Sequence, residues 1–515
     1  MSKTTLRYLA FWLDYASKNK GNWQAIQNEF DQINRGWNIL SSDVDHGLTR
    51  AERDEKLIGF VGALQGYLEI RGIWDKGYIP WLEQALAAAR RQGEPVNEFS
   101  LLNNLGAGYT DLGLIEQAEK YLEQALEIAK KLGDIDSQIS VINNLGVLYY
   151  QTGRRQDALQ KLEQAYSICN QPEIIPKAAH ILNNLGTAFQ SMGNPDRALE
   201  CFTQALQVHQ NNRDESGAST SLHNLGTLSA ETGDWQNAIA NLQQSLNFRE
   251  RLGDRAREAV THANLGRVYA RLGNFGDAIE LMEQALSIQQ EVRDLPAAAD
   301  TLDSLGNIYR QLGQWDTSVR YLNESISLHQ KVGNLAGEAE ALNNLGLVYR
   351  ARDLIDEALK CYEKALMLER TVGNQSGEAS TLNNIGVIHR MKKEYDQALE
   401  VYGKVLEIRR AVRDKSGEAA TLNNIGRVYR LTGDIDLAMY YYQQAYGLLQ
   451  KTGEKVNLSS ILSNIAMLHI ESERWLDAEK ALEVCVEIDR SLGLPTLAED
   501  VQALDWVRRR MQGEK

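Results

Sequence analysis

Residues 421–430 read TLNNIGRVYR, and close variants of this string recur every forty residues. Ten copies follow one another without insertion, from LLNNLGAGYT at 101–110 to ILSNIAMLHI at 461–470. Self-similarity at a fixed period indicates an architecture in which each unit packs against its neighbours. The sequence therefore predicts ten consecutive units of forty residues over 101–494.

Each unit reads as two helices separated by a glycine-containing turn. In the first helix, Leu422, Ile425 and Tyr429 recur at the spacing of one helical face. The second helix carries a small residue such as Ala438 and ends near Gly-Asp or Gly-Asn, which are C-cap and N-cap residues. A glycine such as Gly426 inside a helix costs about 1 kcal/mol, so its recurrence predicts close packing of the two helices.

This pattern of Leu, Gly, Tyr and two small residues resembles the tetratricopeptide repeat in a form of forty residues. The resemblance covers 101–494 strongly and 61–100 more weakly, where LQGYLEIRG and WLEQALAAARRQG keep the frame. It implies an all-α, right-handed superhelix of helical hairpins whose first helices line a concave groove. The LNNLG strings resemble those of kinesin light chain, of Leu-Gly-Asn repeat adaptors and of repeat arrays in bacterial STAND-type regulators.

The two ends of the chain depart from the repeat. Residues 1–60 show helical patterns in which we expect Trp12, Trp23 and Trp37 to be core residues. This region loosely resembles the helical linker before the arrays of STAND ATPases. Residues 495–515 read as one amphipathic helix, which we expect to cap the last repeat.

Helical geometry divides the first helix into an apolar arc and a polar arc. The apolar arc holds Thr421, Leu422, Ile425, Val428 and Tyr429. The opposite arc holds Ala420, Asn423, Arg427 and Arg430, with Asn424 at its edge. If the units pack as the resemblance implies, the polar arc faces the groove.

Two columns of asparagine run along this polar arc. An amide offers both a donor and an acceptor, which match an extended peptide backbone, and the resemblance implies that the amides hold a ligand backbone. The alternative is that they tie neighbouring helices together. The candidates are Asn103, Asn104, Asn143, Asn144, Asn183, Asn184, Asn224, Asn264, Asn343, Asn344, Asn383, Asn384, Asn423 and Asn424.

Arginine occupies the end of the first helix in four successive units. Guanidinium groups pair bidentately with carboxylates or phosphates, so the column predicts an acidic ligand. Arg near a helix C-terminus also gains about 0.3–1 kcal/mol from the macrodipole, which does not explain its restriction to four units. The candidates are Arg310, Arg350, Arg390 and Arg430, with Arg267, Arg271 and Arg427 on the same face.

The composition limits the classes of partner. The chain has 515 residues and a formal charge of -14, which argues against a general binder of nucleic acid or of anionic membranes. It lacks a signal peptide pattern and a long apolar run. The four cysteines form no CxxC pair and are expected to be buried, reduced thiols, which favours the cytoplasm.

The motifs of self-contained enzymes are missing. The sequence has no GxxxxGK[ST], HExxH or GxSxG motif, so we expect no catalysis and no cofactor. His180, His223 and His262 are expected to be groove or packing residues rather than metal ligands. The leading hypothesis is a scaffold that binds an extended, acidic protein segment. The alternative is a regulatory subunit of a bacterial signalling or defence system that controls a STAND ATPase or a caspase-like protease.

Overall fold

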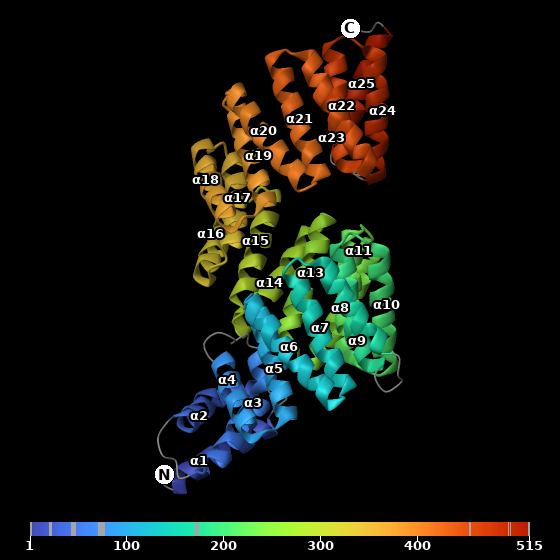
Figure 1. Cartoon of the computed structure of the whole chain (residues 1–515). Helices are drawn as coiled ribbons and strands as arrows, with labels where there is room; N and C mark the ends of the chain where they lie inside the picture. The colour runs from blue at the N-terminus through green and yellow to red at the C-terminus, as the bar shows by residue number, and fades with distance from the viewer. Residues whose placement is uncertain are drawn as a thin grey trace. The chain divides into compact units, whose positions relative to one another are not determined.

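The computed structural model describes residues 3–19, 23–42, 48–70, 78–169, 175–452, 455–492, 494 and 496–512. Over these residues the chain consists of 25 α-helices, without a strand (Figure 1). It divides into two compact units, unit 1 at 1–293 and unit 2 at 294–515. The predicted all-α solenoid is confirmed.

Unit 1 begins with four helices that precede the regular repeats. Its helices are α1 Lys3–Lys18, α2 Trp23–Ser41, α3 Arg50–Ile70, α4 Ile79–Gln92, α5 Pro95–Asp111, α6 Ile115–Leu132, α7 Ile135–Gln151, α8 Arg155–Ile168, α9 Ile175–Ser191, α10 Pro195–Asn211, α11 Glu215–Glu231, α12 Trp235–Leu252, α13 Arg255–Arg271 and α14 Phe275–Val292. From α5 onward each odd-numbered helix packs against the even-numbered helix that follows it and, within the unit, against the one before it.

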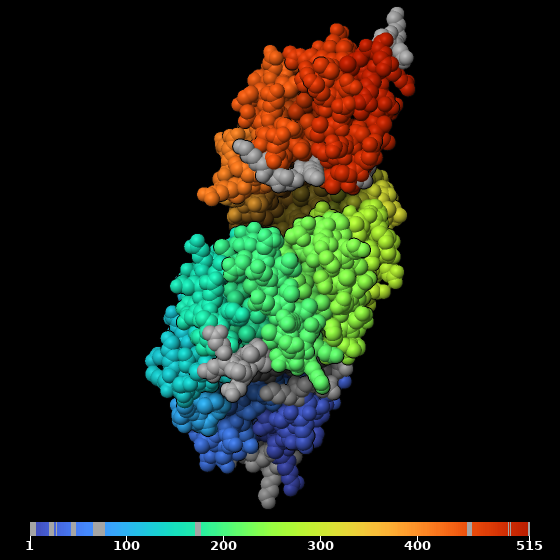
Figure 2. All heavy atoms as spheres, turned by 90° about the vertical axis from the view of Figure 1, so that its right-hand side faces the viewer, coloured from blue at the N-terminus to red at the C-terminus, as the bar shows by residue number. Residues whose placement is uncertain are grey.

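Unit 2 continues the same alternation and ends in an additional helix. Its helices are α15 Leu295–Gln311, α16 Trp315–Val332, α17 Leu335–Ala351, α18 Ile355–Val372, α19 Gln375–Met391, α20 Tyr395–Ala411, α21 Lys415–Thr432, α22 Ile435–Thr452, α23 Lys455–Glu471, α24 Trp475–Leu492 and α25 Leu497–Met511. The first helices α15, α17, α19, α21 and α23 are also direct neighbours of one another. In Figure 2 the colours follow chain order across the surface of each unit, as expected when a hairpin contacts only its neighbours.

Several junctions between repeats follow the predicted capping chemistry, whereas at three others Arg213, Arg293 and Arg413 take the left-handed position in place of glycine. Gly333 ends α16 in the left-handed conformation with φ 73°. Asn334 then caps α17, because its side-chain oxygen accepts a hydrogen bond from the Gly337 backbone N–H at 3.0 Å. A left-handed glycine avoids the Cβ clash of other residues, and the amide satisfies one of the helix's orphan donors. These two residues let the chain reverse direction without a long loop.

The glycine inside the first helix permits the close packing that the sequence predicts. A Cβ placed on Gly386 would lie 2.5 Å from Cε1 of Tyr402 on the second helix of the same hairpin. Real Cβ atoms essentially never approach this closely. The ring of Tyr402 therefore passes directly beneath α19.

The predicted apolar arc is the buried face of the first helix. In α21, Leu422, Ile425 and Val428 are buried, as is the Thr421 side chain. Tyr429 is half-buried and stacks on Tyr441 with ring centroids 5.4 Å apart. Helical periodicity was therefore sufficient to predict the core of the repeat.

Both ends of the chain contribute residues to hydrophobic clusters. Trp37 is buried and stacks on Trp81 at 4.4 Å between ring centroids, and Trp12 is half-buried against the same cluster. The expectation for Trp23 falls outside the described side chains. At the other end, Leu504 and Val507 of α25 join the cluster formed by α24.

All four cysteines carry free thiols. Cys169, Cys201 and Cys485 are buried as expected, but Cys361 is only half-buried, because its position in α18 lies at the margin of the core. Among the described residues, no helix combines the length and the hydropathy that crossing a membrane requires.

Candidate protein-binding surface

The asparagine columns form hydrogen bonds between successive repeats. The amide N–H of one first helix donates to the amide oxygen of the preceding first helix, at 2.9 Å for Asn424 to Asn383 and 2.9 Å for Asn384 to Asn343. The other pairs are Asn144 to Asn103 at 3.0 Å, Asn184 to Asn143 at 2.8 Å, Asn224 to Asn183 at 3.5 Å and Asn464 to Asn423 at 2.9 Å. We call this series the amide ladder. It matches the alternative that the amides tie neighbouring helices together.

Two rungs of the amide ladder use a different acceptor. Asn264 contacts Nε2 of His223 at 3.0 Å, and burial lowers the pKa of His223 to about 3, so that this imidazole is neutral. Asn344 donates to both carboxylate oxygens of Asp303, at 3.1 and 2.9 Å. Asn104, in the first regular repeat, is half-buried and also engaged in an interaction.

Each ladder hydrogen bond uses one donor hydrogen and one acceptor of its amide pair. An amide group has two donors and one carbonyl oxygen, so the half-buried pairs retain hydrogen-bonding capacity for a ligand. A structural role and a ligand role for the same residues are therefore compatible. The ligand role stays a prediction.

Removing one side of a rung measures the structural role. We expect Asn383→Ala to lower the free energy of unfolding by about 1 kcal/mol, because the amide of Asn424 loses its acceptor. In a double-mutant cycle with Asn424→Ala, urea unfolding should give a coupling energy of about 0.5–1 kcal/mol. Additive effects of the two substitutions would contradict the pairing.

The arginines of unit 2 lie on the same first-helix face and are largely unpaired. We call Arg310, Arg350, Arg390, Arg427 and Arg430 the Arg column. Arg430 forms an ion pair with Glu471 at 3.2 Å. Within the part of the chain that the structure describes, no carboxylate lies within ion-pair distance of the other four.

Several other basic residues of unit 2 have acidic partners in the same or the neighbouring repeat. Arg352 pairs with Asp316 and Lys392 with Asp356, both at 3.0 Å. The outer helices add Arg370 to Glu378 and Arg410 to Glu418, both at 2.7 Å. Other basic residues, such as Arg320, Lys360 and Lys393, form no ion pair with any described residue but are exposed, whereas Arg310, Arg350 and Arg390 are half-buried.

Burial and mutual repulsion act on the Arg column. The pKa of Arg310 is lowered by burial and then by the charge of Arg350. Burial also lowers the pKa of Arg427, and the charges of Arg390 and Arg430 lower it further. Such a cluster stabilises an incoming anion more than an isolated exposed arginine does, because the anion relieves like-charge repulsion.

The two predicted arginines of unit 1 line a separate cavity. Arg267 and Arg271 are exposed, and Arg267 donates a hydrogen bond to Asn264. With Trp235 and Leu242 they border a cavity of about 520 Å³. Because they belong to the other unit, the structure does not assign them to the Arg column.

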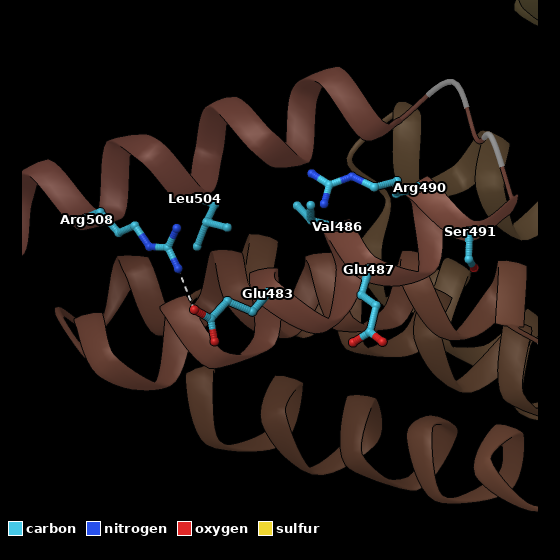
Figure 3. A pocket seen from close by; sticks show the side chains of 7 residues that line it. All are labelled: Glu483, Val486, Glu487, Arg490, Ser491, Leu504 and Arg508. Carbon is cyan, nitrogen blue, oxygen red and sulfur yellow. Dashed lines mark hydrogen bonds and ion pairs between the residues drawn. The ribbon is translucent and has the colours of Figure 1, made fainter.

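A further cavity lies at the C-terminal cap. It has a volume of about 480 Å³ between α24 and α25, and Glu483, Arg490 and Arg508 are among its lining residues (Figure 3). Arg508 points toward Glu483 and pairs with it at 2.5 Å, and it also pairs with Glu479 at 2.7 Å. Since its charge is already matched, this cavity is a weaker candidate for an acidic ligand.

The three histidines considered in the sequence do not converge on one site. His180 lies beside His209 and Asp214, and His262 lies beside Glu250 and Glu258, with ligand atoms in each group within 4.8 Å of one another. The sequence did not suggest these groups, because their members come from different helices. Each group already contains a contact of its own, His209 to Asp214 at 2.7 Å and Glu258 to Arg255 at 2.5 Å. The expectation of no metal site stays a prediction.

The repeat pattern matches a known family over more than half of the chain. The model of the tetratricopeptide repeat matches residues 97–171, 177–251, 217–291, 297–368 and 377–451. The chain belongs to the tetratricopeptide repeat family. Membership of this family supports a protein-interaction scaffold, which is the general function expected from the sequence. No curated protein matches the chain.

Several solved structures are similar to parts of this tetratricopeptide protein. BtubC (BKLC) from P. vanneervenii is 25% identical over 42% of this chain and 91% of its own, with a TM-score of 0.37. A Rap protein complexed with Competence and Sporulation Factor is 14% identical over 71% and 99%, with a TM-score of 0.48. TPR-like repeats described as kinesin light chain from Podosopora anserina are 20% identical over 38% and 97%, with a TM-score of 0.34. Family membership rests on the family match rather than on these structures.

Proposed function

We propose that unit 2 binds an extended acidic protein segment along its first helices. The observation that carries the proposal is that four members of the Arg column have no carboxylate partner among the described residues, although Arg310, Arg350 and Arg390 are half-buried at one repeat position. A carboxylate ligand supplies the missing charge and pairs with guanidinium groups in a bidentate geometry. The tetratricopeptide family makes a protein segment the favoured source of these carboxylates.

The length of the segment follows from repeat geometry. Neighbouring first helices pack about 10 Å apart, and an extended chain advances about 3.3 Å per residue. About three residues of the ligand therefore span each repeat, and on the order of a dozen ligand residues contact the four repeats of the Arg column. The amide ladder runs beside it and offers further donors to the ligand backbone.

The overall charge favours a short acidic protein segment over nucleic acid or an anionic membrane. A net charge of -14 repels nucleic acid and anionic lipid, so attraction is limited to a local surface of a few arginines. The four free thiols suit a reducing compartment, and we place the protein in the cytoplasm.

The proposal is tested with a fluorescently labelled peptide of twelve glutamates, read by fluorescence anisotropy. We expect Arg350→Glu with Arg390→Glu to weaken binding by about 100-fold or more, because two contacts become repulsive. We also expect affinity to fall as salt rises, since exposed contacts between charges are screened.

The control is Arg352→Glu with Arg370→Glu, which changes the net charge by the same amount in the repeat that carries Arg350. These two arginines already have acidic partners, and the control variant should bind within about threefold of the wild type. Equal loss in both variants, or no binding of the peptide by the wild type, would remove the Arg column as the ligand site.

A further inference from the structure

Three second helices in unit 2 carry a buried tyrosine whose hydroxyl has no partner among the described residues. Tyr362, Tyr402 and Tyr442 occupy the same repeat position in α18, α20 and α22, and each is 0% exposed. Their hydroxyl oxygens make no hydrogen bond within that part of the chain. The other regular repeats have only apolar residues at this position, namely Leu122, Leu162, Phe202, Leu242, Met282, Leu322 and Leu482.

The glycine of the first helix sets the direction of these rings. A Cβ on Gly346, Gly386 or Gly426 would lie 2.5 to 2.6 Å from Cε1 of the facing tyrosine. It would also lie 2.9 to 3.2 Å from Cζ, the carbon that bears the hydroxyl. Cδ1 is as close as Cζ or closer, at 2.7 to 2.9 Å, so one edge of each ring lies beneath the first helix.

The Arg column surrounds these hydroxyls with positive charge. Burial raises the pKa of Tyr362 to about 12, and the charges of Arg350 and Arg310 oppose this rise. Burial also raises the pKa of Tyr402, against the charge of Arg390. The Arg390 side chain lies close enough to the Tyr402 hydroxyl to lower its pKa, but neither Nε of Arg390 nor this hydroxyl makes a hydrogen bond of good geometry among the residues that the structure describes.

The same arrangement holds at Tyr442, where burial raises the pKa to about 12, and the charges of Arg430 and Arg427 and the approach of the Arg430 side chain oppose this rise. All three hydroxyls are therefore protonated at neutral pH and available as O–H donors. A buried donor without a partner costs about 1–3 kcal/mol, and phenylalanine, which Phe202 shows to fit this position, avoids that cost. The hydroxyls thus weaken the free protein in the very repeats that carry the unpaired arginines.

We propose that the hydroxyls of Tyr362, Tyr402 and Tyr442 are ligand-binding groups that donate hydrogen bonds to carboxylates held by the Arg column. The proposal rests on the acidic-segment function and defines the ligand more closely. A shift of a long arginine side chain toward a carboxylate uncovers the hydroxyl beneath it. Because the tyrosines recur once per repeat, the favoured ligand carries an acidic residue at about every third position.

The test uses the triple variant Tyr362→Phe, Tyr402→Phe, Tyr442→Phe and a labelled (Glu-Ser-Gly)4 peptide. We expect binding to weaken by at least about tenfold for each hydrogen bond to a charged acceptor that is lost. The thermal midpoint should be unchanged or higher, since the unpaired hydroxyls are gone. The control is Tyr441→Phe, whose ring stacks on Tyr429, and it should bind as the wild type does.

The salt dependence separates this inference from the proposed function. The triple Phe variant removes no charge, so its affinity should fall with salt at the wild-type slope, whereas the Arg350→Glu, Arg390→Glu variant should lose that dependence. Wild-type affinity in the triple Phe variant, with binding still lost in the arginine variant, would overturn the inference and leave the function standing. Failure of the wild type to bind both acidic peptides would overturn both.

Discussion

Gly386→Val should lower the free energy of unfolding by about 3 kcal/mol or more, which is the largest effect on stability that we expect from one substitution. The new Cβ would lie 2.5 Å from Cε1 of Tyr402, and the ring has no room to withdraw because it is fully buried. The gain in helix propensity from replacing glycine is only about 0.5 kcal/mol. Urea unfolding followed by far-ultraviolet circular dichroism measures the loss.

Gly403→Val is the matched control. Gly403 also lies inside a helix, in the same hairpin, but a Cβ there meets no atom within 4 Å. The control should be neutral or slightly stabilising, because only helix propensity changes. If both valine variants unfold at the same urea concentration, close approach is not the reason for Gly386.

Asp303→Asn should stabilise unit 2 by an amount that grows with pH. Burial raises the pKa of Asp303 to about 7, and the charges of Glu340 and Asp300 act in the same direction. A folded-state pKa above the unfolded value of about 3.9 means that stability is full at acidic pH and falls as pH rises through 7. The ionised carboxylate is the unfavourable form.

At pH 8 we expect the Asp303→Asn variant to be more stable than the wild type by on the order of 2 kcal/mol. This value is smaller than the full pKa difference implies, because water reaches part of the side chain and screens its charge. Near pH 4 the difference should vanish. The amide introduced by this substitution should also accept the hydrogen bond from Asn344, as the amide of Asn343 does from Asn384. Thermal unfolding between pH 4 and 8 measures this effect.

The reverse substitution, Asn343→Asp, supplies the matched test in the next repeat. It should introduce a loss of stability on raising the pH from 4 to 8, because the new carboxyl group takes the position that Asp303 has one repeat earlier. A pH profile of Asp303→Asn parallel to that of the wild type would show that Asp303 is not the titrating group.

Periodicity alone predicted the hairpins and their cores. Leu422, Ile425 and Val428 are buried as the helical wheel requires, and Gly386 makes the close contact that its position implied. These properties depend on spacing within one helix or on repetition, and both can be read from a single sequence.

Contacts between repeats could not be predicted in the same way. The helical wheel predicts which face of the helix carries Asn424, but it does not predict that Asn424 contacts Asn383 of the preceding first helix. The pairing of Arg352 with Asp316, likewise, joins residues 36 positions apart, so the sequence could not show which arginines lack a partner. The ring of Tyr402 belongs to the hydrophobic core, as its position in the repeat suggests. Only the structure shows that its hydroxyl group makes no hydrogen bond of good geometry among the described residues.

The amide ladder has a consequence for how such a chain changes in length. From Asn343 to Asn464 every rung joins a donor from one forty-residue unit to an acceptor of the preceding unit, so the two complete units of this stretch bring one of each. Elsewhere the ladder is interrupted, because Ala263 has no amide and Ser304 bonds within its own helix. Loss of the single unit that contributes Asn383 and Asn384 would bring Asn424 to Asn343 and leave no amide without a counterpart. Whole repeats can therefore be duplicated or deleted by recombination, and the length of peptide that the surface accommodates changes in steps of about three residues.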